Sequence, residues 1–196
     1  MGATLLVTCV ACTGGAKESR EPSGTHRSGN IAPLAQLADI NVEGDPFSHL
    51  DPDGGLHPLA EVRAGKDRLI VFTRGKSCGL LVAGTDSSSG STINLESAWP
   101  HDSSEGSRRY TAGPYNTVSG AGSGDLRSWA EMSCSEAAVV VKYSSPEAAK
   151  AASTRGSVAV KTPAGSPAPL IMVVGSKEAQ NKILPQAAEA GEARQG

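Results

Sequence analysis

The sequence predicts a mainly β fold of the α+β class: an antiparallel sandwich-like or barrel-like sheet of about seven or eight strands with about two or three short helices. Three observations predict it. The apolar runs are short and rich in Val, Ile and Leu, clusters of Gly, Pro and Ser separate them, and one run alternates apolar and polar residues. Only 4% of the residues are aromatic, so we expect a core of Val, Leu, Ile and Ala.

Length and charge limit the class of protein. The chain has 196 residues and a formal net charge of -2, which excludes a strongly basic protein that binds nucleic acid. We expect a single globular β-rich domain over residues 31–185 and a disordered tail over residues 186–196.

The first part of the domain carries weak signals. In "NIAPLAQLADINV" (30–42) the apolar residues recur three apart, which indicates a weak helical stripe interrupted by Pro33. The next segment, 45–58, is rich in Pro and Gly and is predicted to consist of turns.

The clearest strands follow. "RLIVFT" (68–73) and "CGLLVAG" (78–84) are apolar runs separated by "RGKS", which predicts a hairpin. In "STINLESAW" (91–99), Ile93, Leu95 and Trp99 point one way while Asn94 and Glu96 point the other, as in a half-buried strand.

The second half predicts further strands and two helices. "RSWAEMSC" (127–134) and "EAAVVVKY" (136–143) form a second strand pair, and "SVAVK" (157–161) and "PLIMVV" (169–174) are two more strands, the latter in a central position. The segment "SSPEAAKAA" (144–152) predicts a short helix with Ser145 as its N-cap. The segment "KEAQNKIL" (177–184) predicts a second short helix, which Pro185 ends.

The N-terminus holds an apolar run, Thr4–Ala11, of about eight residues. A membrane-spanning helix needs about twenty residues, whereas the core of a signal peptide needs about seven to fifteen. Val10-Ala11-Cys12 is a branched apolar residue, a small residue and a cysteine, and a polar stretch over 13–30 follows. This pattern resembles the lipobox of bacterial prolipoproteins. Cys9 is the alternative, but Thr8 precedes it and it lies inside the apolar run.

The resemblance implies an anchored, exported protein. Residues 1–11 would be a signal peptide, and Cys12 would carry lipid at the start of a flexible tether over residues 12–30. The domain would then lie outside the cytoplasm, anchored to the outer face of the cell membrane. No Lys or Arg precedes the apolar run, so we expect the true translation start upstream. The alternative is a buried N-terminal strand with two inert cysteines.

Two cysteines remain after this processing, Cys78 and Cys134. In an oxidising compartment they predict one disulfide, which would close a loop of about 55 residues and stabilise the domain by roughly 4 kcal/mol. It would tie the first hairpin to the second strand pair. The alternative is two buried free thiols in a cytosolic protein.

Several motifs resemble catalytic or ligand sites without completing one. Gly75-Lys76-Ser77 lacks the first glycine of a phosphate-binding loop, and "SGAGSGD" (119–125) lacks the last glycine of a dinucleotide fingerprint, so we expect a hairpin turn and a flexible loop. Asp51–Gly55 indicates a turn rather than a calcium loop. The side chains of adjacent residues diverge, which is not the geometry of a triad, so His101-Asp102-Ser103 indicates a helix or turn cap after Pro100 rather than a hydrolase site. We expect no metal and no cofactor.

The segment between Trp99 and Trp129 is the candidate recognition surface. It also carries Arg108, Arg109, Tyr110 and Tyr115 among many Gly and Ser residues. We expect at least one tyrosine to be exposed and both tryptophans to be mostly buried. The two arginines and two tyrosines are therefore candidate ligand-binding residues, suited to a cell-wall glycan or an anionic polymer. The alternative is that the aromatic side chains belong to the core.

Three functions fit this chain. The first is a binding or interaction domain at the membrane surface, with a cell-wall glycan or another envelope protein as partner. The second is an extracellular hydrolase with an unrecognised site, and the third is a structural or chaperone-like envelope lipoprotein. We favour the first, for which enzymatic activity is not expected.

Overall fold

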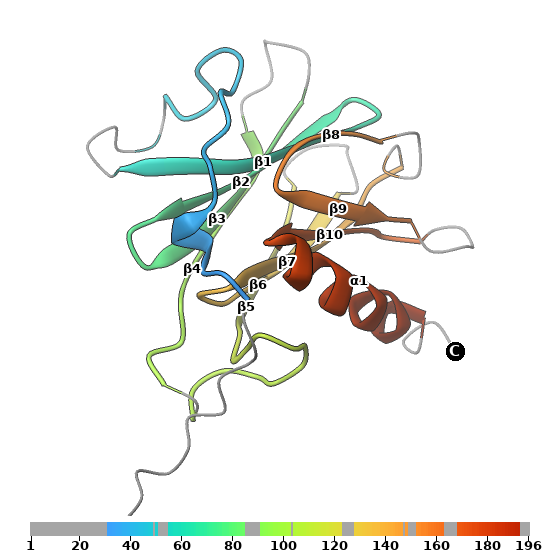
Figure 1. The fold of residues 1–196 in the computed structure, drawn as a ribbon. Helices are drawn as coiled ribbons and strands as arrows, with labels where there is room; N and C mark the ends of the chain where they lie inside the picture. Colours follow the sequence, from blue (N-terminus) through green and yellow to red (C-terminus); the bar gives the residue numbers. More distant parts are fainter. Residues whose placement is uncertain are drawn as a thin grey trace, which may run out of the picture.

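The structure is a computed structural model that describes residues 31–48, 50, 55–84, 91–102, 104–122, 128–146, 148, 152–162 and 168–192. In these residues ten strands form two antiparallel sheets of five strands each, accompanied by one α-helix and one 3-10 turn (Figure 1). The mainly β prediction is confirmed. The sheet is an open sandwich rather than a closed barrel, with more strands and fewer helices than expected.

The first sheet has the strand order β4-β3-β2-β1-β8. Its members are β1 (Leu56–Ala64), β2 (Asp67–Arg74), β3 (Ser77–Gly84), β4 (Ser91–Ala98) and β8 (Ala152–Gly156). The predicted hairpin is β2–β3, and Gly75, with φ of 57°, turns the chain between its strands. The alternation in β4 is confirmed, because Ile93 and Leu95 are buried while Asn94 and Glu96 are exposed.

The second sheet has the strand order β5-β6-β7-β10-β9. Its members are β5 (Asn116–Ala121), β6 (Trp129–Cys134), β7 (Ala138–Ser144), β9 (Val158–Lys161) and β10 (Leu170–Gly175). The expected strand pair is β6–β7, and β10 lies between β7 and β9 as its continuous apolar run predicted.

The main core lies between the two sheets, where alternate residues of each strand meet. It is largely aliphatic, with Leu80 and Val82 from β3 facing a layer that includes Met132 and Val141. Leu34, in the 3-10 helix η1 (Leu34–Gln36), is fully buried in this core and its N–H donates to Glu136 O at 2.8 Å. The helical stripe expected over 30–42 is therefore reduced to a single turn among the described residues.

The outer face of the first sheet is covered by the segment that follows η1. Ile70, Phe72 and Leu81 pack there against residues of the segment 42–50, and the Phe47 ring meets the Phe72 ring edge-on, with ring centroids 5.4 Å apart.

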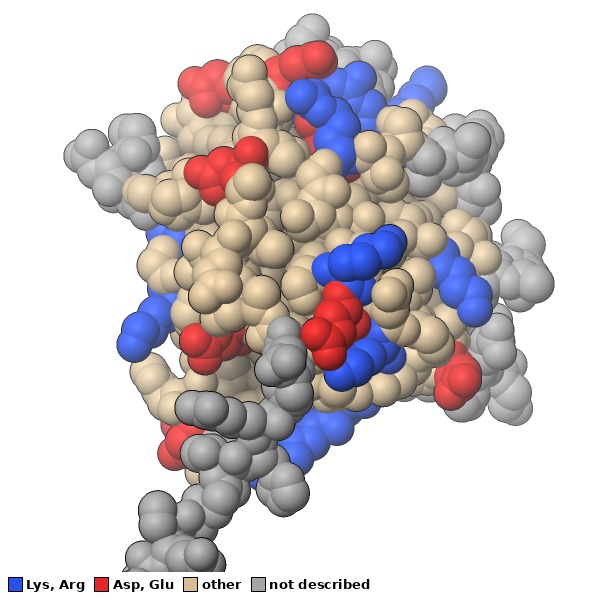
Figure 2. All heavy atoms as spheres, viewed as in Figure 1, with Lys and Arg blue, Asp and Glu red and all other residues tan. Residues whose placement is uncertain are grey.

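An ion-pair network around Glu61 of β1 lies on the same sheet. Arg63 and Arg68 both donate to Glu61 Oε1, at 2.9 and 2.8 Å. Figure 2 shows acidic and basic side chains side by side over the β1–β8 end of the molecule.

The outer face of the second sheet is covered by α1 (Lys177–Glu192), as Figure 1 shows. Ile183 and Ala187 of the helix pack against Ile171 and Val173 of β10. The prediction that Pro185 ends this helix, leaving a disordered tail from residue 186, is wrong for residues 186–192. Burial of the helix beyond Pro185 offsets the backbone hydrogen bond that proline cannot make. Residues 193–196 lie outside the described residues.

Three strands were missed. β1 contains Pro58, which indicated a turn, but the proline lies at a register shift that a strand tolerates. β5 includes part of the expected flexible loop. β8 begins at Ala152, within the helix expected over 144–152; the described residues of that segment form turns, and the rest lie outside the described residues.

Residues 1–30, including Cys9 and Cys12, lie outside the described residues. The expected signal peptide, lipid anchor and tether therefore stay predictions. Within the residues that the structure describes, no helix has the length and apolar character needed to cross a membrane.

Candidate ligand cavity at the disulfide end

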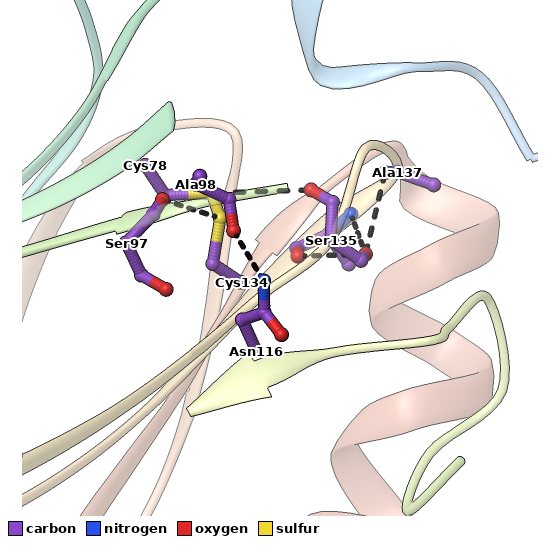
Figure 3. The surroundings of a disulfide bond; sticks show 8 residues. Cys78, Ser97, Ala98, Asn116, Cys134, Ser135 and Ala137 are labelled. Atoms are coloured by element: carbon purple, nitrogen blue, oxygen red, sulfur yellow. Dashed lines mark hydrogen bonds between the residues drawn. A yellow bond between two sulfur atoms is a disulfide. The ribbon is translucent and has the colours of Figure 1, made fainter. Parts of the chain in front are cut away.

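A disulfide joins the two sheets at one end of the sandwich (Figure 3). Cys78 lies near the start of β3 in the first sheet, and Cys134 ends β6 in the second sheet. Both side chains are fully buried, with their Cα atoms 5.9 Å apart. The pairing is the one expected, and it ties the first hairpin to the second strand pair.

The backbone around the disulfide is held from both sides (Figure 3). Cys134 Sγ contacts Ser97 O at 3.3 Å, and Asn116 Nδ2 donates to Ala98 O at 3.0 Å. On the second sheet, Ser135 Oγ accepts from the backbone N–H of Ala138 at 3.0 Å and closes the β6–β7 turn. The segment after β4 and the β6–β7 turn are therefore fixed relative to each other.

A cavity of about 260 Å³ opens beside these two segments. Its lining comes from the β2–β3 turn, the end of β4 and the β6–β7 turn, and consists of Lys76, Ser77, Ala98, Trp99, Pro100, His101 and Glu136. The backbone N–H of Trp99 donates to the backbone O of Lys76 at 2.8 Å, which holds the aromatic residue against the hairpin turn. The cavity thus has one wall from each sheet, and the disulfide joins the sheets next to it.

The turn at one edge of the cavity is capped by its own acidic side chains. Asp102 Oδ1 accepts from the N–H groups of Ser104 and Glu105 at 2.7 and 3.2 Å, and Glu105 Oε2 accepts from His101 N–H at 2.9 Å. The hydrogen bonds from the Ser104 hydroxyl and N–H lower the pKa of Asp102. The predicted turn cap is confirmed at Asp102, while Ser103 lies outside the described residues.

Lys76 and Glu136, which carry opposite charges, both belong to the cavity lining. Lys76 and Glu136 are exposed, and neither forms an ion pair with any side chain in the described part of the chain. Trp99 Nε1 is buried and has no hydrogen-bond partner among the described residues. A cavity lined by Trp99, Pro100, a cation and an anion can hold a small polar molecule by apolar contact and by charge.

A smaller cavity of about 160 Å³ lies on the other side of the β2–β3 turn. It is lined in part by Leu34, Gly75 and the exposed pair of His57 and Asp39, whose Nδ1 and Oδ2 atoms are 3.1 Å apart. This pair is open to solvent and contributes little binding energy on its own.

The structure overturns the expectation for the tyrosines. Tyr110 and Tyr115 are 4% and 1% exposed and pack edge-on, with ring centroids 5.5 Å apart, in the core beneath α1. Burial raises the pKa of Tyr115, whose hydroxyl donates to Thr111 O at 2.7 Å. Gly113 permits this packing, because a Cβ there would meet the Tyr115 ring at 2.3 Å. Neither ring is available to a ligand.

The two arginines of the same segment lie apart from the cavity lining. Arg109 Nη1 donates to Glu131 Oε1 at 3.0 Å, and its guanidinium lies 5.8 Å from the centre of the Tyr110 ring. Arg108 is exposed. The predicted surface of two arginines and two tyrosines is therefore not assembled around an exposed aromatic ring.

The tryptophans also differ from expectation. Trp129, at the start of β6, is 38% exposed, because its side chain lies on the outer face of the sheet. Trp99 is partly buried and lines the cavity. Sequence reasoning singled out Trp99 but missed Lys76 and Glu136 as its neighbours, since they come from turns far apart in the chain. The cysteine pair was the available signal, because Cys78 and Cys134 each lie two residues from one of them.

Among the described residues, no group of three or more His, Cys, Asp or Glu side chains is placed to hold a metal ion. His26, His49 and residues 51–54 of the "DPDGG" segment lie outside the described residues.

Comparison of the chain with protein-family models, with curated proteins and with solved structures finds no match. The class of protein that the fold and cavity define is a disulfide-linked β-sandwich of two five-stranded sheets.

Proposed function

We propose that this chain is an exported, lipid-anchored envelope protein whose β-sandwich binds a ligand without chemistry of its own. Cys12 carries the lipid, residues 12–30 form the tether, and the domain begins at about Ile31. The buried disulfide between Cys78 and Cys134 supports a place outside the cytoplasm, because disulfides persist in oxidising compartments and are rare in the cytosol.

The observation that carries the binding role is the cavity at the disulfide end, whose lining comes from both sheets. It brings together an aromatic side chain, a cation and an anion, and within the described part of the chain neither charge has an ion-pair partner. The disulfide restrains the backbone that carries them. A rigid site loses little conformational entropy when a ligand binds.

The same geometry favours binding over hydrolysis. Hydrolysis by a triad would need a base oriented by an acid and facing a nucleophile. Here the carboxylate next to His101 accepts backbone N–H groups of its own turn, so it is occupied in capping.

The anchor is tested by fractionation of the full-length protein expressed in a bacterial host. We expect wild type and Cys9→Ala to enter the detergent phase and Cys12→Ala to appear in the medium or the aqueous phase. Cys9→Ala is the matched control, because Cys9 lies in the apolar run that directly precedes Cys12. Retention of Cys12→Ala in the membrane would overturn the proposed anchor.

A further inference from the structure

We propose that the cavity beside Trp99 binds a small zwitterion, an amino acid or short peptide that carries both an ammonium and a carboxylate group. The inference rests on the proposed binding role and names its ligand class. It starts from the charges. Lys76 and Glu136 both line the cavity, but they form no ion pair with each other or with other described side chains.

A zwitterion satisfies both charges at once. Its carboxylate would accept charge-assisted hydrogen bonds from the Lys76 ammonium, and its ammonium group would donate to the Glu136 carboxylate. A ligand with one charge would leave the other protein charge unpaired, and a neutral sugar would form an ion pair with neither Lys76 nor Glu136. The pair therefore selects against ligands that carry a single charge.

The size and the wall of the cavity fit the same class. Its volume of about 260 Å³ lies below the range of about 300–1,000 Å³ that holds drug-sized ligands, so it suits a smaller molecule. Trp99 and Pro100 supply an apolar surface that a methyl or methylene group of the ligand can contact.

The two charges come from different sheets, so their separation depends on how the sheets are joined. Lys76 lies two residues before Cys78, and Glu136 lies two residues after Cys134. The disulfide therefore restrains the relative positions of the two backbone segments that carry the cation and the anion. Removing it should weaken binding of the zwitterion even under conditions where the sandwich stays folded.

The test uses the full chain labelled with ¹⁵N and follows its two indole N–H signals, which Trp129→Phe assigns. Trp129 begins β6 and Cys134 ends it, so the Trp129 signal is an internal reference about 17 Å away along the strand. The probe is L-alanyl-L-alanine. Two blocked forms of the dipeptide serve as controls: N-acetyl-L-alanyl-L-alanine lacks the ammonium group, and L-alanyl-L-alaninamide lacks the carboxylate. The neutral sugar N-acetylglucosamine is a third control.

We expect the dipeptide to shift the Trp99 signal saturably, with the Trp129 signal unchanged, and each blocked probe to bind at least about fivefold more weakly. Lys76→Met and Glu136→Gln should each weaken the dipeptide to a similar extent. The matched control is Lys66→Met, because Gly65-Lys66 forms an exposed turn like Gly75-Lys76, with φ of 62° and 57° at the two glycines, and does not line the cavity.

Equal binding of the dipeptide and the blocked probes, tighter binding of the sugar, or no shift of Trp99 with any probe would each overturn the inference. So would equal losses in Lys76→Met and Lys66→Met. These outcomes are independent of the proposed anchor, which the Cys12→Ala fractionation reads separately.

Discussion

Tyr143 donates a hydrogen bond from its hydroxyl to Asp67 Oδ2 at 2.8 Å, which links β7 of the second sheet to the start of β2 in the first sheet. Ser145 donates to the same oxygen at 2.8 Å, so the buried carboxylate is held twice. The disulfide of Cys78 and Cys134 joins the sheets elsewhere, near the opposite end of β2, since Thr73 pairs with Cys78. The two sheets are thus linked at both ends of β2, by the Tyr143–Asp67 hydrogen bond at one end and by the disulfide at the other.

The hydroxyl of Tyr143 should therefore contribute measurably to stability. We expect Tyr143→Phe to lower the free energy of unfolding in urea by about 1–3 kcal/mol, because the buried Asp67 carboxylate loses one of its two hydroxyl partners. A double-mutant cycle with Asp67→Asn should give a coupling free energy of at least about 0.5 kcal/mol. Strict additivity of the two changes would contradict the link.

The disulfide should stabilise the fold through the loop it closes. The cysteines are 56 residues apart, and replacing both with alanine should lower the free energy of unfolding by about 4 kcal/mol. Urea unfolding of wild type, wild type with reductant and the double variant measures this. Reduced wild type and the double variant should agree; equal stability with and without the disulfide would contradict the account.

Two of the four aromatic residues in the segment from Trp99 to Trp129 should respond oppositely to truncation. Tyr115 is 1% exposed, so Tyr115→Ala should cost about 3–5 kcal/mol, as large core truncations do. Trp129 is 38% exposed, so Trp129→Ala should cost about 1 kcal/mol or less. Thermal unfolding distinguishes the two cases. A Tyr115→Ala variant as stable as wild type would place the ring at the surface after all.

Acid should weaken the network around Glu61, whose side chain is 1% exposed. Burial alone would raise the pKa of Glu61, but hydrogen bonds from Arg68 and Arg63 outweigh it and lower the pKa below its ordinary value. A lowered pKa in the folded state means that this stability is present above about pH 4.3, the ordinary glutamate pKa, and is lost as the pH falls through the folded pKa. Glu61→Gln should be less stable at pH 7 and show a smaller loss of unfolding free energy between pH 5 and pH 3. An unchanged acid dependence in this variant would exclude the network as its source.

Much of the fold could be predicted because the relevant signals are local. Seven strands were identified from short apolar runs, and the alternation in "STINLESAW" correctly assigned the faces of β4. The missed strands β1 and β5 contain proline and glycine, and only pairing with neighbouring strands makes them extended. Helix α1 passes Pro185 because its second half packs on β10, which no local propensity reveals.

The candidate site could be predicted only in part, for the same reason. The cysteine pair follows from counting, whereas Lys76 and Glu136 line one cavity only because two distant turns lie beside the disulfide. The glycines around Tyr110 and Tyr115 indicated flexibility, but at Gly113 the missing side chain makes room for a buried ring. Glycine permits close packing as readily as motion, and sequence alone does not distinguish them.

The central claim, an exported lipid-anchored domain with a structural disulfide, is tested most directly by non-reducing mass spectrometry of the intact protein purified from cell membranes. The account predicts a chain that begins at Cys12, carries a lipid on that residue, and yields one linked peptide pair joining Cys78 to Cys134. A chain that retains residues 1–11 without lipid, or that carries two free thiols at positions 78 and 134, would contradict it.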